Sequence, residues 1–120
     1  MDIQTIKKRR DFLQGNNAPY AAMPSVVVQS YLRTDEVVKT DDSIMMGITC
    51  SKKVGNAVIR NRAKRRLREA AKIVLKEIGI KKTNYIFIAR KDATIKVKFT
   101  ELCNDIENGI KKIYGQEKGK

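Results

Sequence analysis

Histidine and tryptophan are absent from this chain of 120 residues. Without histidine, the sequence lacks the side chain that most often acts as a general base, and it lacks the Ser-His and Cys-His pairs that activate nucleophiles. A protein that hydrolyses its substrate with its own side chains is therefore a poor expectation. We predict no catalytic residue in this chain.

Cysteine is also scarce, since Cys50 and Cys103 are the only two and they form no CxxC pair. Metal-ligand spacing is absent, so no metal site is predicted. Two buried, reduced thiols in a cytoplasmic protein account for this pattern. The basic start is not followed by an apolar signal segment, and no apolar run approaches the length that spans a membrane. We expect an unexported, soluble protein.

Acidic residues are few: 13 Asp and Glu stand against 26 Lys and Arg, which gives a formal net charge of +13. A field of this sign attracts phosphate, so nucleic acid or an anionic membrane surface is the natural partner. The hydrophobic fraction of 42% is enough for a globular core. We expect a single domain over residues 1–120, with residues 116–120 frayed.

The positive charge is concentrated between Ser51 and Lys72, where nine residues are Lys or Arg and only Glu69 is acidic. Residues 57–78 contain no Gly or Pro, and their apolar side chains recur every three or four positions, which predicts an amphipathic helix. Asn56 is a suitable N-cap and Gly79 a suitable end. The polar face carries these residues: Arg60, Asn61, Lys64, Arg65, Arg68 and Lys72. Like charges at this spacing repel, and a bound polyanion would remove the repulsion.

The remaining elements follow from shorter patterns. We predict a first helix over residues 3–14, strands over 25–33, 44–50 and 85–89, and a closing helix over 98–114. Pro19 and Pro24 make residues 18–24 an irregular connection, and residues 52–56 a loop. The fold class is α+β with the order α-β-β-β-α-β-α, in which the third strand is not located. General statistics would make the crossover around the long helix right-handed.

One face of the strand over 25–33 carries polar side chains in line, namely Gln29, Tyr31 and Arg33. A planar amide, a phenol and a guanidinium suit base stacking and phosphate contact. A merely solvated face explains the same pattern equally well.

The ordered run from Gly47 to Ala70 closely resembles the RNR-motif signature of the bacterial ribonuclease P protein subunit. The resemblance extends to Asp11-Phe12, to the strand that ends at Arg90, and to the closing helix. It implies a small α/β sandwich with a left-handed β-α-β crossover. It also implies binding to the catalytic RNA of ribonuclease P and to the 5′ leader of precursor tRNA. In that family the RNA, with Mg²⁺, cleaves the phosphodiester, and the protein assists.

The resemblance also assigns residues to these roles. Contact with the catalytic RNA falls on Lys52, Lys53, Asn56, Arg60, Asn61, Arg62, Lys64, Arg65 and Arg68. The leader cleft is implied at Phe12, Gln29, Tyr31 and Arg33. Two positions depart from the family pattern, since Asn16 replaces a second aromatic and Gln29 stands where a strand Tyr is common in part of the family. We therefore expect leader stacking to be weaker, or to involve Tyr31 or Tyr20.

Two other function classes compete with this interpretation. A protein nuclease that acts alone is disfavoured by the missing histidine and by the lack of a compact acidic cluster in the sequence. A general binder of nucleic acids or membranes needs only charge, whereas Asn56 and Asn61 add uncharged donors within the cationic run. We expect no membrane and no DNA partner.

Overall fold

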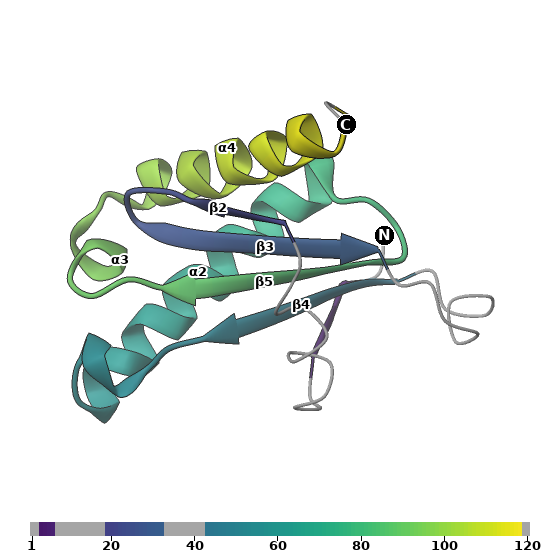
Figure 1. Ribbon diagram of the computed structural model, residues 1–120. Coiled ribbons are helices and arrows are strands. Elements are labelled where there is room, and N and C mark those ends of the chain that lie inside the picture. Colours follow the sequence, from purple (N-terminus) through teal and green to yellow (C-terminus); the bar gives the residue numbers. More distant parts are fainter. Residues whose placement is uncertain (1–2, 7–18, 33–42, 119–120) are drawn as a thin grey trace.

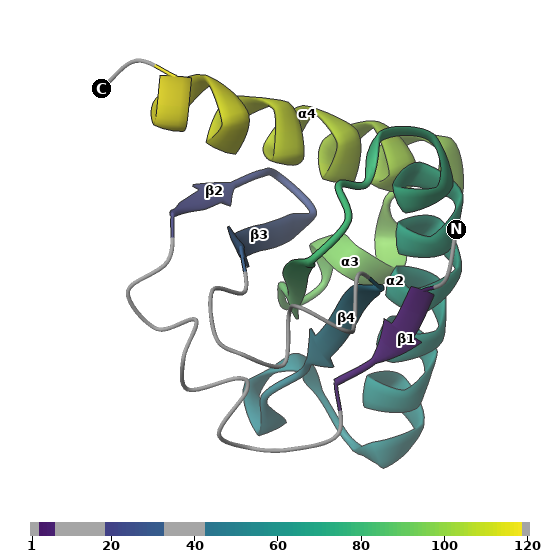
Figure 2. The same ribbon diagram turned by 90° about the vertical axis from the view of Figure 1, so that its right-hand side faces the viewer.

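The computed structural model describes residues 3–6, 19–32 and 43–118. In this part of the chain a five-stranded sheet forms one layer and two long helices form the other (Figure 1). Figure 2 shows both helices on the same side of the sheet. This arrangement confirms the predicted α+β class and the two-layer sandwich.

The strands pair in the order β1-β4-β5-β3-β2. They are β1 (Ile3–Thr5), β2 (Tyr20–Ala22), β3 (Val26–Leu32), β4 (Ile44–Thr49) and β5 (Thr83–Ala89). β1, β4 and β5 run parallel, whereas β3 is antiparallel to β5 and β2 is antiparallel to β3. The apolar run of β5 lies at the centre of the sheet, and most of its side chains on both faces are buried.

The helices are α2 (Ala57–Ile78), α3 (Ala93–Lys96) and α4 (Phe99–Lys118), and a 3-10 turn, η2 (Lys52–Val54), precedes α2. α4 packs over β2 and β3, and α2 packs over β4 and β5. α3 is a single turn between β5 and α4, and it contacts α2. The other face of the sheet carries neither α2 nor α4 (Figure 2).

The β4-α2-β5 crossover is left-handed. β4 and β5 are parallel neighbours, and α2 connects them on the helical side of the sheet. When that side faces the viewer and both strands point upward, β5 lies to the left of β4 (Figures 1 and 2). The general preference for right-handed crossovers therefore does not hold here. The hand is the one that the family resemblance implied.

The core lies between the sheet and the two long helices. α4 contributes four fully buried side chains, Leu102, Ile106, Ile110 and Ile113. α2 contributes a stripe at three- and four-residue spacing, namely Ala63, Leu67, Ala70, Ala71, Val74 and Leu75. Full burial of a large apolar side chain contributes about 1.5–3 kcal/mol, so this layer anchors α2 firmly to the sheet.

The C-terminal end of α2 is closed by a tight contact. Gly79 donates its backbone N–H to the carbonyl oxygen of Leu75 at 2.9 Å, in an extended conformation that any residue can adopt. A Cβ at Gly79 would lie 2.5 Å from that oxygen and 2.6 Å from Cδ1 of Ile44. Gly79 therefore ends the helix as predicted, and the reason is close packing of the backbone.

Two local predictions are wrong. Residues 3–5 form β1 instead of the start of a helix, because their backbone pairs in parallel with β4. The rest of the predicted helix, residues 7–14, lies outside the described residues. Within the predicted irregular segment 18–24, Tyr20–Ala22 pairs with β3 and supplies the third strand of the predicted order. In both places hydrogen bonding to a neighbouring strand outweighs the local sequence preference.

Candidate nucleic-acid interface

The short turn η2 precedes α2 and is held in place by one buried side chain. Val54 is buried, whereas Lys52 and Lys53 in the same 3-10 turn are exposed. Gly55 follows with a φ of +154°, and a Cβ there would lie 2.8 Å from Cγ2 of Ile59. A glycine is therefore required between the turn and the helix. The turn holds two lysines at the surface directly before the first turn of α2.

Asn56 begins α2. Its side-chain Oδ1 accepts a hydrogen bond from the backbone N–H of Ile59 at 3.0 Å, which confirms the predicted N-cap. The residue is exposed, and the cap uses only its carbonyl oxygen, so the side-chain NH₂ group remains a donor at the surface. The capping role is structural, and it does not exclude the RNA contact that the resemblance implies.

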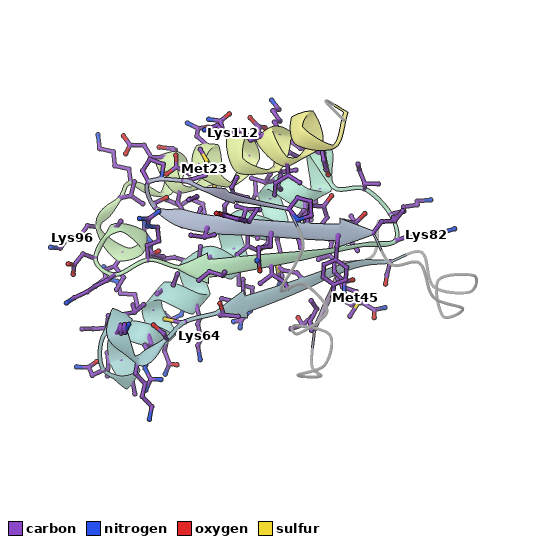
Figure 3. All side chains as sticks on the ribbon, in the orientation of Figure 1. Met23, Met45, Lys64, Lys82, Lys96 and Lys112 are labelled. Carbon is purple, nitrogen blue, oxygen red and sulfur yellow. The ribbon has the colours of Figure 1, made fainter. Side chains whose placement is uncertain are left out.

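The structure places the other predicted contacts on the N-terminal half of α2. Asn61, Arg62, Arg65 and Arg68 are exposed, whereas Arg60 and Lys64 are half-buried. Arg60 and Lys64 lie beside Cys50, the residue that follows β4. Figure 3 shows Lys64 at the end of α2 that flanks the end of β4. The nine predicted residues thus gather on η2 and the N-terminal half of α2, where those on the helix occupy more than one of its sides.

These cations are not neutralised within the described residues. Among the described residues, Nζ of Lys111 and Oε2 of Glu107 on α4 form an ion pair at 3.5 Å. No cation of η2 or α2 forms an ion pair with a described residue. Burial raises the pKa of the Cys50 thiol, and the positive charges of Lys64 and Arg60 oppose that rise. A dense positive field therefore surrounds the start of α2.

Arg66 differs from its neighbours. Its guanidinium donates to the carbonyl oxygen of Val97, between α3 and α4. The Nε atoms of Arg66 and Arg60 are both buried and have no hydrogen-bond partner among the residues described. Arg66 thus joins α2 to the α3 segment. The sequence could not predict this role, because the residue it contacts follows β5.

The face of the sheet opposite α2 and α4 carries the predicted leader residues that the structure describes. Gln29 and Tyr31 on β3 are half-buried, and the Tyr31 hydroxyl accepts a hydrogen bond from Nδ2 of Asn84 at 2.8 Å. Tyr20 on β2 lies opposite Gln29 in the antiparallel register and is 59% exposed. Phe12, Asn16 and Arg33 lie outside the described residues.

A Mg²⁺ ion does not fit the cationic surface of α2. Magnesium needs oxygen ligands, usually carboxylates, and this surface presents ammonium, guanidinium and amide groups. Over residues 3–6, 19–32 and 43–118 no three His, Cys, Asp or Glu side chains group together in a way that could hold a metal. In the same residues no helix has the length and apolar character needed to cross a membrane.

A two-layer α+β domain whose long helix carries an array of Lys and Arg without ion pairs among the described residues is typical of nucleic-acid-binding proteins. The family model described as Ribonuclease P matches residues 2–114. The chain is 41% identical over 112 residues to the ribonuclease P protein component of Ruegeria pomeroyi, covering 93% of this chain and 87% of the relative. This chain belongs to the ribonuclease P protein family.

Solved structures agree with that assignment. The ribonuclease P protein of Staphylococcus aureus superposes with a TM-score of 0.70 at 32% identity, over 89% of this chain and 92% of that one. The protein from Thermotoga maritima gives 0.69 at 25% identity, over 87% and 92% of the two chains. The chain is thus the protein component of a bacterial ribonuclease ribonucleoprotein with a role in tRNA processing, and an RNA is its partner.

Proposed function

We propose that this chain is the non-catalytic subunit of ribonuclease P, in which α2 and η2 bind the catalytic RNA and the face of the sheet opposite α2 and α4 receives the 5′ leader of precursor tRNA. One observation carries the proposal. The cations of Lys52–Arg68 gather on η2 and the N-terminal half of α2 and have no ion pair among the described residues. A folded RNA supplies the missing negative charge.

The chemistry of the side chains fits a phosphate backbone. Arg62, Arg65 and Arg68 present planar forks that match pairs of phosphate oxygens, whereas Lys52 and Lys53 are mobile point charges. Asn56 and Asn61 add uncharged hydrogen-bond donors at the same end of α2, where they can contact phosphate or sugar groups. Since α2 is anchored by its buried stripe, this array is held in a fixed geometry, which favours a structured RNA over a flexible polyanion.

The face of the sheet opposite α2 and α4 supports the leader assignment. Gln29, Tyr31 and the exposed Tyr20 lie on the same face, so a single strand on this face would meet one amide and two phenol side chains. Stacking of a base on an aromatic ring contributes about 1–3 kcal/mol. The contributions of Phe12 and Arg33 are part of the proposal and concern residues outside the described part of the chain.

Cleavage is assigned to the RNA with its own Mg²⁺. The chain contains no histidine, and the cationic surface does not suit a metal ion. In this division of labour the protein raises the affinity for precursor over mature tRNA by holding the leader. It also shields the phosphates of the catalytic RNA, which lowers the Mg²⁺ concentration that the RNA needs.

The proposal is tested by salt dependence. In the Arg65→Ala/Arg68→Ala variant two exposed cations are removed without disturbing the core, and affinity for the catalytic RNA should fall. The slope of log affinity against log salt should become shallower by about 2 if both side chains contact duplex phosphates. The matched control is Lys111→Ala/Lys112→Ala, which removes the same charge from α4. A slope equal to that of the control variant contradicts the proposal.

Two further assays separate the rival functions. Purified protein with precursor tRNA and Mg²⁺, but without the catalytic RNA, should give no cleavage, whereas reconstitution with the RNA at low Mg²⁺ should give turnover above that of the RNA alone. Competition with nonspecific RNA and with anionic vesicles should displace the catalytic RNA only weakly. Efficient displacement by vesicles would indicate a general surface binder.

A further inference from the structure

The contact between Arg66 and Val97 brings a second group of cations to α2. The guanidinium of Arg66 donates to the carbonyl oxygen of Val97. Val97 is flanked in the sequence by Lys96 and Lys98, and both lysines are exposed. Arg62, one turn before Arg66 on the same stripe of α2, is exposed as well. We call these four residues the α3 flank: Arg62, Arg66, Lys96 and Lys98.

The α3 flank lies on a different side of α2 from Arg60 and Lys64. Residues in a helix advance by about 100°, so Arg62 and Arg66 lie roughly 200–240° around the axis from Arg60. The charges of Arg60 and Lys64 act on Cys50, the residue that follows β4, whereas Arg66 contacts the end of α3. Figure 3 shows Lys64 and Lys96 at the same end of the molecule. The start of α2 is therefore cationic on both of its sides.

The acids near the α3 flank leave its charge unneutralised. Asp92 precedes Lys96 by four positions and Glu101 follows Lys98 by three, and both acids are exposed. Neither acid forms an ion pair with these lysines among the described residues. Glu69 is also exposed on α2 and likewise has no such pair. The lysines thus remain available to an external anion.

We propose that the α3 flank binds a second segment of the phosphate backbone of the catalytic RNA, so that the N-terminal half of α2 is held between two RNA segments. This inference rests on the proposed function, because it takes the RNA partner from there. Arg60 and Lys64 face a different side of a helix that is about 10–12 Å across with its side chains, so a second RNA segment accounts for contact at Lys96 and Lys98. Contact on both sides fixes the orientation of the protein, which contact on one side does not.

The test uses Lys96→Gln/Lys98→Gln, which removes two exposed charges and keeps the Arg66–Val97 contact. We expect lower affinity for the catalytic RNA and a salt dependence shallower by about 2. In hydroxyl-radical footprinting, the RNA segment that loses protection should differ from the segment affected by Lys64→Ala/Arg68→Ala, whose two residues lie within about 80° of Arg60 around α2. The matched control is Lys111→Gln/Lys112→Gln on α4. Thermal unfolding of each variant should match that of the wild-type chain.

Each outcome of the test decides between the two proposals. If Lys96→Gln/Lys98→Gln behaves like its control while Arg65→Ala/Arg68→Ala weakens binding, the second contact does not exist and the proposed function stands. If neither variant weakens binding, the proposed function fails as well. If the lysine variant loses affinity only for precursor tRNA, measured separately, the α3 flank does not bind the catalytic RNA and the inference is overturned.

Discussion

Oδ1 of Asn56 accepts the backbone N–H of Ile59 at 3.0 Å, and this single hydrogen bond begins the helix that carries the cationic surface. Lys53 lies three positions before Asn56 and Arg60 four positions after it. The capped start of α2 therefore lies between the lysines of η2 and the arginines of α2. Helix stability and the presentation of the surface therefore depend on the same side chain.

Asn56 allows these two roles to be separated. Asn56→Asp keeps an N-cap oxygen and places a negative charge at the helix N-terminus, so the free energy of unfolding should stay within about 0.5 kcal/mol. The new charge faces the bound polyanion, and affinity for the catalytic RNA should fall. Asn56→Ala should instead destabilise the fold by about 1 kcal/mol. Urea denaturation and RNA titration of both variants provide the check, and unchanged RNA affinity in Asn56→Asp would place the RNA away from the cap.

A buried hydroxyl fastens the β2–β3 connection to the region that follows β5. Oγ1 of Thr94 donates to the carbonyl oxygen of Ser25 at 2.6 Å and accepts the backbone N–H of Arg90 at 2.8 Å. Asp105 on α4 accepts the Ser25 hydroxyl at 2.6 Å, which extends the network to the closing helix. This network sets the position of α3 and, through it, of the α3 flank.

Thr94→Val keeps the shape of the side chain and removes both hydrogen bonds. Two backbone groups then lose their partner in a fully buried site, and the free energy of unfolding should fall by about 1–3 kcal/mol. Thr100→Val on the exposed side of α4 is the matched control and should change it by less than about 0.5 kcal/mol. Urea denaturation measures both. Equal stabilities would show that water or rearrangement replaces the lost partners.

Sequence periodicity predicted the parts of the fold that local preference controls. α2 spans Ala57–Ile78 as expected, because that stretch has an uninterrupted apolar stripe, a cap and a closing glycine. β1 was missed, because Ile3 and Ile6 have a spacing compatible with a helix, whereas the strand depends on pairing with β4. Local patterns do not contain that partner. The third strand was unlocated for the same reason, since Tyr20–Ala22 is ordered by β3.

The candidate site shows a similar division. The helical period placed Arg60, Lys64 and Arg68 on one side of α2 and predicted their common surface. It could not separate Arg66, whose guanidinium is used by Val97, because that contact depends on the return of the chain after β5. The family resemblance assigned RNA contacts to residues of η2 and α2. It did not point to Lys96 and Lys98, because their place beside α2 depends on how α3 packs on that helix.

The pKa of the Cys50 thiol responds to the positive charges of Lys64 and Arg60. Burial raises the pKa of its thiol above the usual 9.0, and Lys64 opposes the rise, so Lys64→Gln should raise it further. The folded state keeps a proton that the unfolded state releases, and the free energy of unfolding should therefore fall as pH rises above about 9. Alkylation by iodoacetamide against pH, in a Cys103→Ala background, measures the thiol. A thiol pKa that falls in Lys64→Gln would show that the charge of Lys64 does not oppose the rise.

Substitution of two glycines of α4 by alanine should change the free energy of unfolding in opposite directions. A Cβ at Gly109 would lie 2.9 Å from Cγ2 of Val28 on β3, so α4 must move away from the sheet, whereas a Cβ at Gly115 meets nothing within 4 Å. Alanine is favoured over glycine in a helix by about 0.5–1 kcal/mol, and Gly115→Ala should raise the free energy of unfolding by up to that amount. Gly109→Ala should lower it by about 1–3 kcal/mol, since overpacking outweighs the helix preference. Thermal and urea unfolding of the pair test this, and stabilisation by both substitutions would mean that α4 packs less closely on β3 than the contact at Val28 indicates.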